Sequence, residues 1–100
     1  MNSINGGSVI RHQESAALRR LLTAGAAIVW HPHALKRARE REVSKLDAER
    51  AIRRAQVTGL DLQANGEERW RIAWADEDGC KFTVVVTPIE PDVLVITVLD

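Results

Sequence analysis

The sequence predicts a single α+β domain in which a helix, a short strand and two further helices precede a four-stranded antiparallel meander. Hydrophobic residues recur at helical spacing in the first half of the chain, and apolar and polar residues alternate in the second half. Turn-forming residues separate the alternating segments. Helices and strands segregated in this way are typical of helices packed on one face of a twisted sheet. With 100 residues, 45% of them hydrophobic, the chain is long enough for one core.

The first segments predict an arm, a helix and a strand. Residues 1–13 are polar and contain glycine and serine, so we expect a flexible arm followed by a domain that spans residues 14–100. A helix is predicted over residues 14–24, and Gly25 is placed to end it. Its hydrophobic residues at helical spacing are Leu18, Leu21 and Leu22. Residues 26–30 are apolar and predict a short buried strand, which ends at a His-Pro step because the residue before proline avoids the α region.

Two helices joined by a tight corner follow. The first is predicted over residues 33–42. Ser44 and Asp47 lie three residues apart and have the form of a capping box, so the second helix should start at Lys45. Its apolar positions have the spacing of one helix face and are Ala48, Ala51, Ile52 and Ala55.

The second half of the chain predicts four strands, over residues 57–63, 69–75, 81–87 and 93–99. An Asn-Gly pair between the first two is a hairpin signal. One face of the second strand carries Trp70, Ile72 and Trp74. For these two tryptophans and for Trp30, packing in the core is favoured over stacking on RNA bases.

Charge is distributed unevenly along a chain whose formal net charge is zero. Residues 33–54 carry eight Lys and Arg against four Asp and Glu, whereas residues 55–100 carry three against nine. A basic pair of helices is thus joined to an acidic sheet. This distribution favours an anionic ligand on the helical side, although the neutral total weakens long-range steering of nucleic acid.

The composition points to a cytoplasmic protein without a cofactor. Cys80 is the single cysteine, so no internal disulfide is expected, and no Cys/His spacing resembles a metal site. The polar start of the chain does not resemble a secretory signal, and no apolar run approaches the roughly 18 residues of a membrane helix. We therefore expect no membrane association, no metal and no cofactor.

The chemistry-bearing residues of the first basic helix are His33, Arg37 and Arg41, which share one face because they lie four residues apart. Arginine matches phosphate oxygens through its planar fork, and histidine can transfer a proton near neutral pH. His33 also lies near the helix N-terminus, where free backbone N–H groups favour an anion. RNA carries a 2′-hydroxyl that such a histidine can deprotonate, and this route needs no metal.

The same residues have a simpler interpretation. Arg37 and Arg41, with Glu40 between them, also fit a solvated helix face with ion pairs one turn apart. His31 and His33 around a proline fit a helix start, and the residues taken alone favour this structural role for His33. Further candidates for contact with RNA are Lys36 on the same helix and Arg69 and Arg71 on the polar strand face.

The basic segment also resembles a known family. Residues 33–44, followed by residues 47–52, are similar to the opening of the small bacterial family named domain of unknown function 4258. The shared pattern is a His-Ala pair, two arginines at successive four-residue steps after the histidine, an apolar-Ser step and a second helix. The family closes on a threonine in an apolar strand, which Thr97 matches. The resemblance covers residues 27–99, with Glu42 where the family often has glycine.

The resemblance implies a layout similar to that of the RelE/ParE and BrnT toxins, in which two helices pack on an antiparallel sheet. That group is linked to metal-independent ribonucleases. It therefore implies catalytic roles for His33, Arg37, Arg41 and Thr97, with Thr97 orienting one of the arginines. It also implies RNA as a ligand and a cognate antitoxin or immunity protein as a partner.

The leading hypothesis is a toxin-like, metal-independent ribonuclease or RNA-binding protein of a bacterial toxin system. The alternative is a non-catalytic binding, regulatory or protein-interaction module of the immunity or antitoxin kind on the same scaffold. In that case the Ala/Leu-rich helix over residues 14–24 is a candidate docking or oligomerisation surface.

Overall fold

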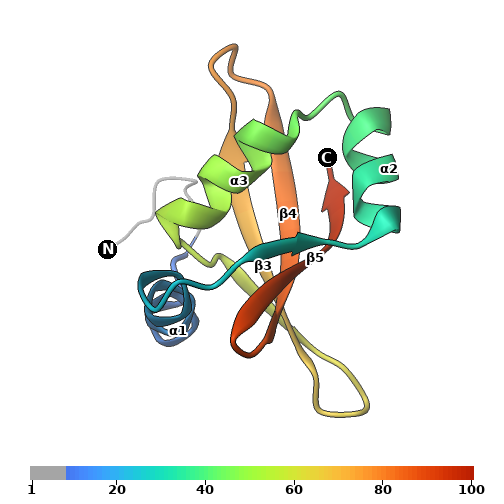
Figure 1. Ribbon diagram of the computed structural model, residues 1–100. Coiled ribbons are helices and arrows are strands. Elements are labelled where there is room, and N and C mark those ends of the chain that lie inside the picture. The colour runs from blue at the N-terminus through green and yellow to red at the C-terminus, as the bar shows by residue number, and fades with distance from the viewer. Residues whose placement is uncertain (1–8) are drawn as a thin grey trace.

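The structure, a computed structural model, describes residues 9–100 and is an α+β fold with three helices and a five-stranded mixed sheet (Figure 1). The first eight residues of the predicted arm lie outside this range. The helices are α1 (His12–Thr23), α2 (Pro32–Glu40) and α3 (Lys45–Arg54). The strands are β1 (Ile28–Trp30), β2 (Gly59–Leu62), β3 (Glu68–Ala75), β4 (Lys81–Ile89) and β5 (Asp92–Leu99).

The sheet has the strand order β1-β5-β4-β3-β2 and differs from the four antiparallel strands that the sequence predicted. Consecutive strands from β2 to β5 pair antiparallel, and β1 adds to β5 in parallel. The Val93 N–H donates to the Ala27 carbonyl at 3.0 Å, and the His31 N–H donates to the Val95 carbonyl at 3.1 Å. The apolar run before α2 thus satisfies its backbone groups on β5, a pairing partner that hydrophobic periodicity does not specify.

Local capping positions α2 and α3. The His31 ring accepts a hydrogen bond at Nδ1 from the His33 N–H at 3.0 Å, and Pro32 occupies the first helical position. The Ser44 hydroxyl oxygen accepts one from the Asp47 N–H at 3.0 Å, which confirms the predicted start of α3 at Lys45. The helix-start interpretation of His31 is also confirmed.

α2 ends at Glu40, two residues earlier than predicted, because Glu42 adopts a left-handed backbone conformation with φ 58°. Its N–H donates to the Arg39 carbonyl at 3.1 Å, and the Val43 N–H donates to the Ala38 carbonyl at 2.9 Å. Such a closure is common at helix ends and favours glycine, since a side chain in this conformation costs roughly 1–2 kcal/mol.

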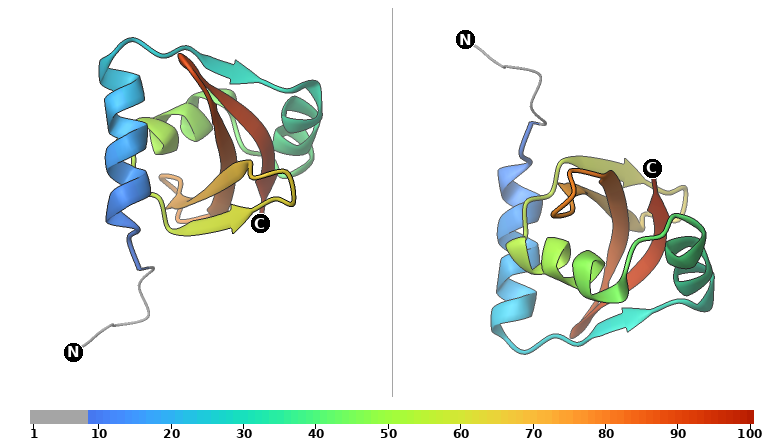
Figure 2. Two further views of the ribbon diagram at one scale, coloured as in Figure 1. Left: turned by 90° about the horizontal axis from the view of Figure 1, so that it is seen from below. Right: turned by 90° about the horizontal axis from the view of Figure 1, so that it is seen from above.

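The core lies between α1, α3 and one face of the sheet (Figure 2). The predicted apolar face of α3 is confirmed, since Ala48, Ala51, Ile52 and Ala55 are all buried. Trp70 and Ile72 of β3 are buried beneath it, and Trp30 packs partly buried against the same core. α1 and α2 lie on opposite sides of the molecule in every view.

α1 begins at His12, two residues before the predicted start, and packs on the core of its own domain. Leu18 is fully buried, and Leu21 and Leu22 pack partly buried against the same cluster. The leucines that suggested a docking or oligomerisation surface are therefore in contact with the domain itself. A role for this helix in oligomerisation stays a prediction.

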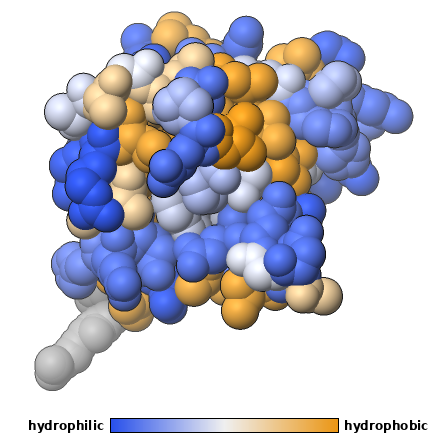
Figure 3. Space-filling view, turned by 60° about the horizontal axis from the view of Figure 1, so that its bottom comes forward, coloured by the Kyte–Doolittle hydropathy of each residue, from blue (hydrophilic) through white to orange (hydrophobic). Residues whose placement is uncertain are grey.

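Apolar residues also reach the surface. Figure 3 shows apolar side chains in the upper middle of one face, with hydrophilic residues around them. The large hydrophobic residues that are exposed within residues 9–100 are Val9, Val29, Leu46, Leu62, Ile89 and Leu99. They come from different segments of the chain, a scatter that is ordinary for a folded protein. None of the described helices is both long and apolar enough to cross a membrane.

Candidate nucleic-acid interface

Helix α2 lies along β5, where β1 no longer covers it. β1 pairs with residues 93–95 of β5, and α2 follows directly and packs against the same strand. The His31 N–H binds the Val95 carbonyl near one end of the helix, and Arg41 Nη1 lies 3.2 Å from Asp100 Oδ2 at the other. Ten helical steps span about 15 Å and five strand steps about 16 Å, so helix and strand run side by side in the same direction.

The sheet-facing side of α2 is defined by Ala34 and Ala38, which are both buried. His33, Arg37 and Arg41 follow one another along the flank of the helix, at the four-residue spacing that the sequence predicted. We call these three residues the α2 stripe. Because 3.6 residues make one turn, each four-residue step turns the stripe a little further around the helix. His33 is the member that lies farthest around the helix from the sheet-facing side, and it is exposed.

Each arginine of the α2 stripe is held by one carboxylate. Arg37 Nη1 lies 3.1 Å from Glu40 Oε1, and Arg41 Nη1 lies 3.2 Å from Asp100 Oδ2. A guanidinium carries five N–H donors, so one carboxylate leaves others for a ligand. The ion pair between Arg37 and Glu40 agrees with the simpler interpretation of this face, yet all three side chains of the stripe remain accessible.

The other predicted residues lie near the α2 stripe to different degrees. Lys36 is exposed on α2, one residue before Arg37. Thr97 is half-buried on β5 opposite Val85 of β4 and, within residues 9–100, makes no hydrogen bond to either arginine of the stripe. Its role in orienting an arginine stays a prediction.

Arg69 and Arg71 belong to the sheet face that points away from α3, because they alternate with buried Trp70 and Ile72. Their guanidiniums pair with Glu67 and Asp61, each at 3.1 Å. The strand that carries them lies two strands from β5, or about 10 Å, so the structure does not join them directly to the α2 stripe.

Arg71 also depends on a glycine in the neighbouring strand. Gly59 is its register partner on β2, and a Cβ atom at Gly59 would lie 2.7 Å from Arg71 Nε. The absence of a side chain at Gly59 therefore lets the Arg71 side chain lie across β2 toward Asp61.

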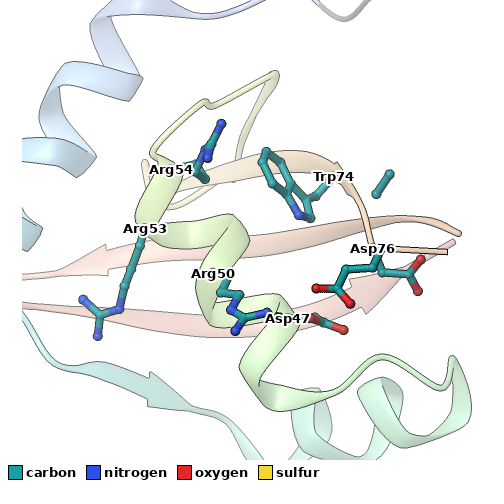
Figure 4. A pocket seen from close by; sticks show the side chains of 8 residues that line it. Asp47, Arg50, Arg53, Arg54, Trp74 and Asp76 are labelled. Carbon is teal, nitrogen blue, oxygen red and sulfur yellow. Dashed lines mark ion pairs between the residues drawn. The ribbon is translucent and has the colours of Figure 1, made fainter. Parts of the chain in front are cut away.

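A second group of arginines, which the sequence did not reveal, lines a cavity beside Trp74 (Figure 4). The Arg54 guanidinium carbon lies 5.0 Å from the Trp74 ring centroid, within the range of a cation–π contact. The two residues line a cavity of about 450 Å³ between α3 and the end of β3, together with Arg50 and Arg53. Of the alternating row on β3, Trp74 is the member that is only half-buried.

The chain was compared with known protein families, curated proteins and solved structures. Residues 30–100 match the family described as Domain of unknown function (DUF4258). The chain belongs to this family. The comparisons with curated proteins and with solved structures found no match. The matched region of this DUF4258 chain contains α2, α3 and strands β2 to β5, whereas α1 precedes it.

The cavity of this DUF4258 domain also has an acidic end. Asp47 and Asp76 line it at the end away from Arg54 (Figure 4), and Glu77 also belongs to its lining. Asp47 pairs loosely with Arg50 at 3.8 Å. Asp76 Oδ1 accepts hydrogen bonds from the N–H groups of Asp78 and Cys80 at 2.9 and 2.8 Å, so this carboxylate also fixes the β3–β4 turn. Over residues 9–100, no cluster of three or more His, Cys, Asp or Glu side chains is arranged to hold a metal ion.

Proposed function

We propose that this DUF4258 domain binds single-stranded RNA along the α2 stripe and cleaves it there without a metal ion. The observation that carries the proposal is the stripe itself: an exposed imidazole and two carboxylate-held guanidiniums on one helix flank. Residues 32–41 carry four Lys and Arg against one Glu, so the local charge suits a phosphodiester even though the whole chain is neutral.

In the proposed reaction, His33 takes the proton of a 2′-hydroxyl, and the resulting oxygen attacks the adjacent phosphorus. The bond from phosphorus to the 5′-oxygen breaks, and water supplies a proton to that oxygen. The products are a 2′,3′-cyclic phosphate and a 5′-hydroxyl. Arg37 and Arg41 would stabilise the negative charge that gathers on the phosphoryl oxygens. A cognate antitoxin or immunity protein would inhibit the enzyme by covering the stripe.

The test is fluorescence anisotropy with a labelled single-stranded RNA over a range of salt concentrations, combined with gel analysis of cleavage. Arg37→Ala with Arg41→Ala is expected to weaken binding and to make the slope of log affinity against log salt shallower by roughly 0.7 for each phosphate that the variant no longer neutralises. His33→Ala is expected to retain binding and to lose cleavage. Arg19→Ala with Arg20→Ala is the matched control, because it removes two exposed positive charges on α1, across the molecule from α2.

Substrate chemistry provides the second arm. A single-stranded oligonucleotide of the same sequence with 2′-deoxyribose in place of every ribose should bind but stay intact, since it lacks the 2′-hydroxyl nucleophile. Uncut RNA with intact, stripe-dependent binding would establish the non-catalytic alternative on the same surface. Binding that is absent at low salt, or unchanged in the double arginine variant, would overturn the proposal.

A further inference from the structure

We infer that the cavity between α3 and the end of β3 binds a guanine nucleotide, free or within an RNA chain, with its base stacked on Trp74. The inference rests on three observations: an aromatic face that reaches the surface, the Arg54 guanidinium beside that face, and the carboxylates of Asp47 and Asp76 at the other end of the cavity (Figure 4). In the case of free nucleotide it does not depend on the α2 stripe.

The aromatic face belongs to Trp74. Its register partner Phe82 and its strand neighbour Ile72 are buried, so the strand is firmly anchored while the Trp74 ring remains half-exposed. A planar cation already lies over this ring, with the Arg54 guanidinium carbon 5.0 Å from the centroid. Because Arg54 is an exposed, long side chain, a base can take its place on the ring and leave the guanidinium free to bind the phosphate.

The cations suit the phosphate of the nucleotide. Arg53 and Arg54 lie in the last turn of α3, and within residues 9–100 neither forms an ion pair with a carboxylate. Arg54 points toward Trp74, whereas Arg53 points away from it (Figure 4). We therefore assign the phosphate of the stacked nucleotide to Arg54 and the phosphate of an adjoining nucleotide, in an RNA chain, to Arg53.

The carboxylates set the orientation and the preference for guanine. Ionised carboxylates accept hydrogen bonds and donate none, so Asp47, Asp76 and Glu77 repel a phosphate and favour a base edge rich in donors. Guanine offers two adjacent donors on its Watson–Crick edge, N1–H and the N2 amino group, which match one carboxylate. Adenine offers a single amino donor beside an acceptor. A volume of about 450 Å³ is in the range of small-ligand pockets.

The first arm of the test is isothermal titration calorimetry of the full chain with guanosine, adenosine and uridine 5′-monophosphates. Guanosine monophosphate is expected to bind most tightly. Trp74→Leu should weaken it about tenfold or more, the effect expected when base stacking is removed. Circular dichroism checks whether Trp74→Leu still folds. If it does not, Arg54→Gln replaces it, because Arg54 is exposed and its substitution should weaken nucleotide binding without disturbing the core. Asp47→Asn with Glu77→Gln should reduce the preference for guanine over adenine.

The second arm separates the two sources of the nucleotide. A uridine oligonucleotide with one central guanosine is compared with an all-uridine oligonucleotide of the same length. If the guanosine increases RNA affinity in the wild type but not in Trp74→Leu or Arg54→Gln, the site takes guanine from RNA. If only the mononucleotide binds, free nucleotide is the ligand.

The inference is overturned if neither guanosine ligand binds, or if binding is unchanged in Trp74→Leu and Arg54→Gln. The Arg37→Ala, Arg41→Ala variant should retain mononucleotide binding, so failure at the α2 stripe is distinguishable from failure here.

Discussion

The hydroxyl oxygen of Ser15 accepts a hydrogen bond from the backbone N–H of Val57 at 2.9 Å, across 42 residues of chain. The carbonyl of the same valine accepts a hydrogen bond from the Arg11 N–H at 2.7 Å. Ser15 and Val57 are both buried. The helix that precedes the DUF4258 match is therefore fastened to the family core through both backbone groups of one residue, and α1 is a structural part of this domain.

Ser15→Ala should destabilise the fold. The substitution leaves the buried Val57 N–H without its acceptor, which costs roughly 1–3 kcal/mol of unfolding free energy. Urea denaturation followed by circular dichroism measures the change. Gln13→Ala is the control because Gln13 is exposed on the same helix. Equal denaturation midpoints for Ser15→Ala and wild type would show that α1 is not fastened in this way.

Substitutions of His31 and His33 should differ in their effect on the stability of the fold. His31→Ala removes the side-chain acceptor at the start of α2 and is expected to cost about 1 kcal/mol, whereas His31→Asn supplies another good cap and should restore most of it. His33→Ala should change stability by less than about 0.5 kcal/mol because its side chain is exposed. Thermal or urea unfolding measures both. A greater destabilisation by His33→Ala than by His31→Ala would contradict this assignment.

Trp30→Phe should weaken the connection between β1 and α3. The indole Nε1–H donates to Glu49 Oε2 at 2.9 Å in a partly buried position, and removing this hydrogen bond is expected to cost about 1 kcal/mol. Glu49→Gln keeps an oxygen acceptor and should retain most of the stability. A double-mutant cycle with Glu49→Ala isolates the pair, and a coupling energy of zero would mean that the hydrogen bond does not contribute.

Arg41 should matter for RNA and little for folding. Its ion pair with Asp100 is exposed, since the Asp100 side chain is 82% accessible, and such pairs contribute about 0–1 kcal/mol. Arg41→Ala is therefore expected to unfold close to the wild-type midpoint while binding RNA more weakly. Asp100→Asn should raise RNA affinity, because it removes the carboxylate that competes with phosphate for Arg41. Lower affinity in Asp100→Asn would indicate that the pair acts mainly by positioning the arginine.

Features determined by neighbouring residues were predictable. Ser44 caps α3 because its hydroxyl reaches an N–H three residues away, and the apolar face of α3 is visible as a spacing along the chain. The four-residue steps of the α2 stripe follow from helix geometry in the same way. The early end of α2 was not predicted, since position 42 carries glutamate rather than the glycine that normally marks a left-handed conformation.

Sequence patterns were sufficient to predict the α+β class, the capped start of α3, and the placing of His33, Arg37 and Arg41 on one helix flank. The folded chain was needed to see that β1 joins β5 in parallel, that Ser15 meets Val57, and that Arg54 covers a half-exposed Trp74. The difference comes from separation along the chain. Helix caps and side-chain alternation depend on residues a few positions apart, whereas strand partners and the covering of a strand end depend on which distant segments the folded core brings together.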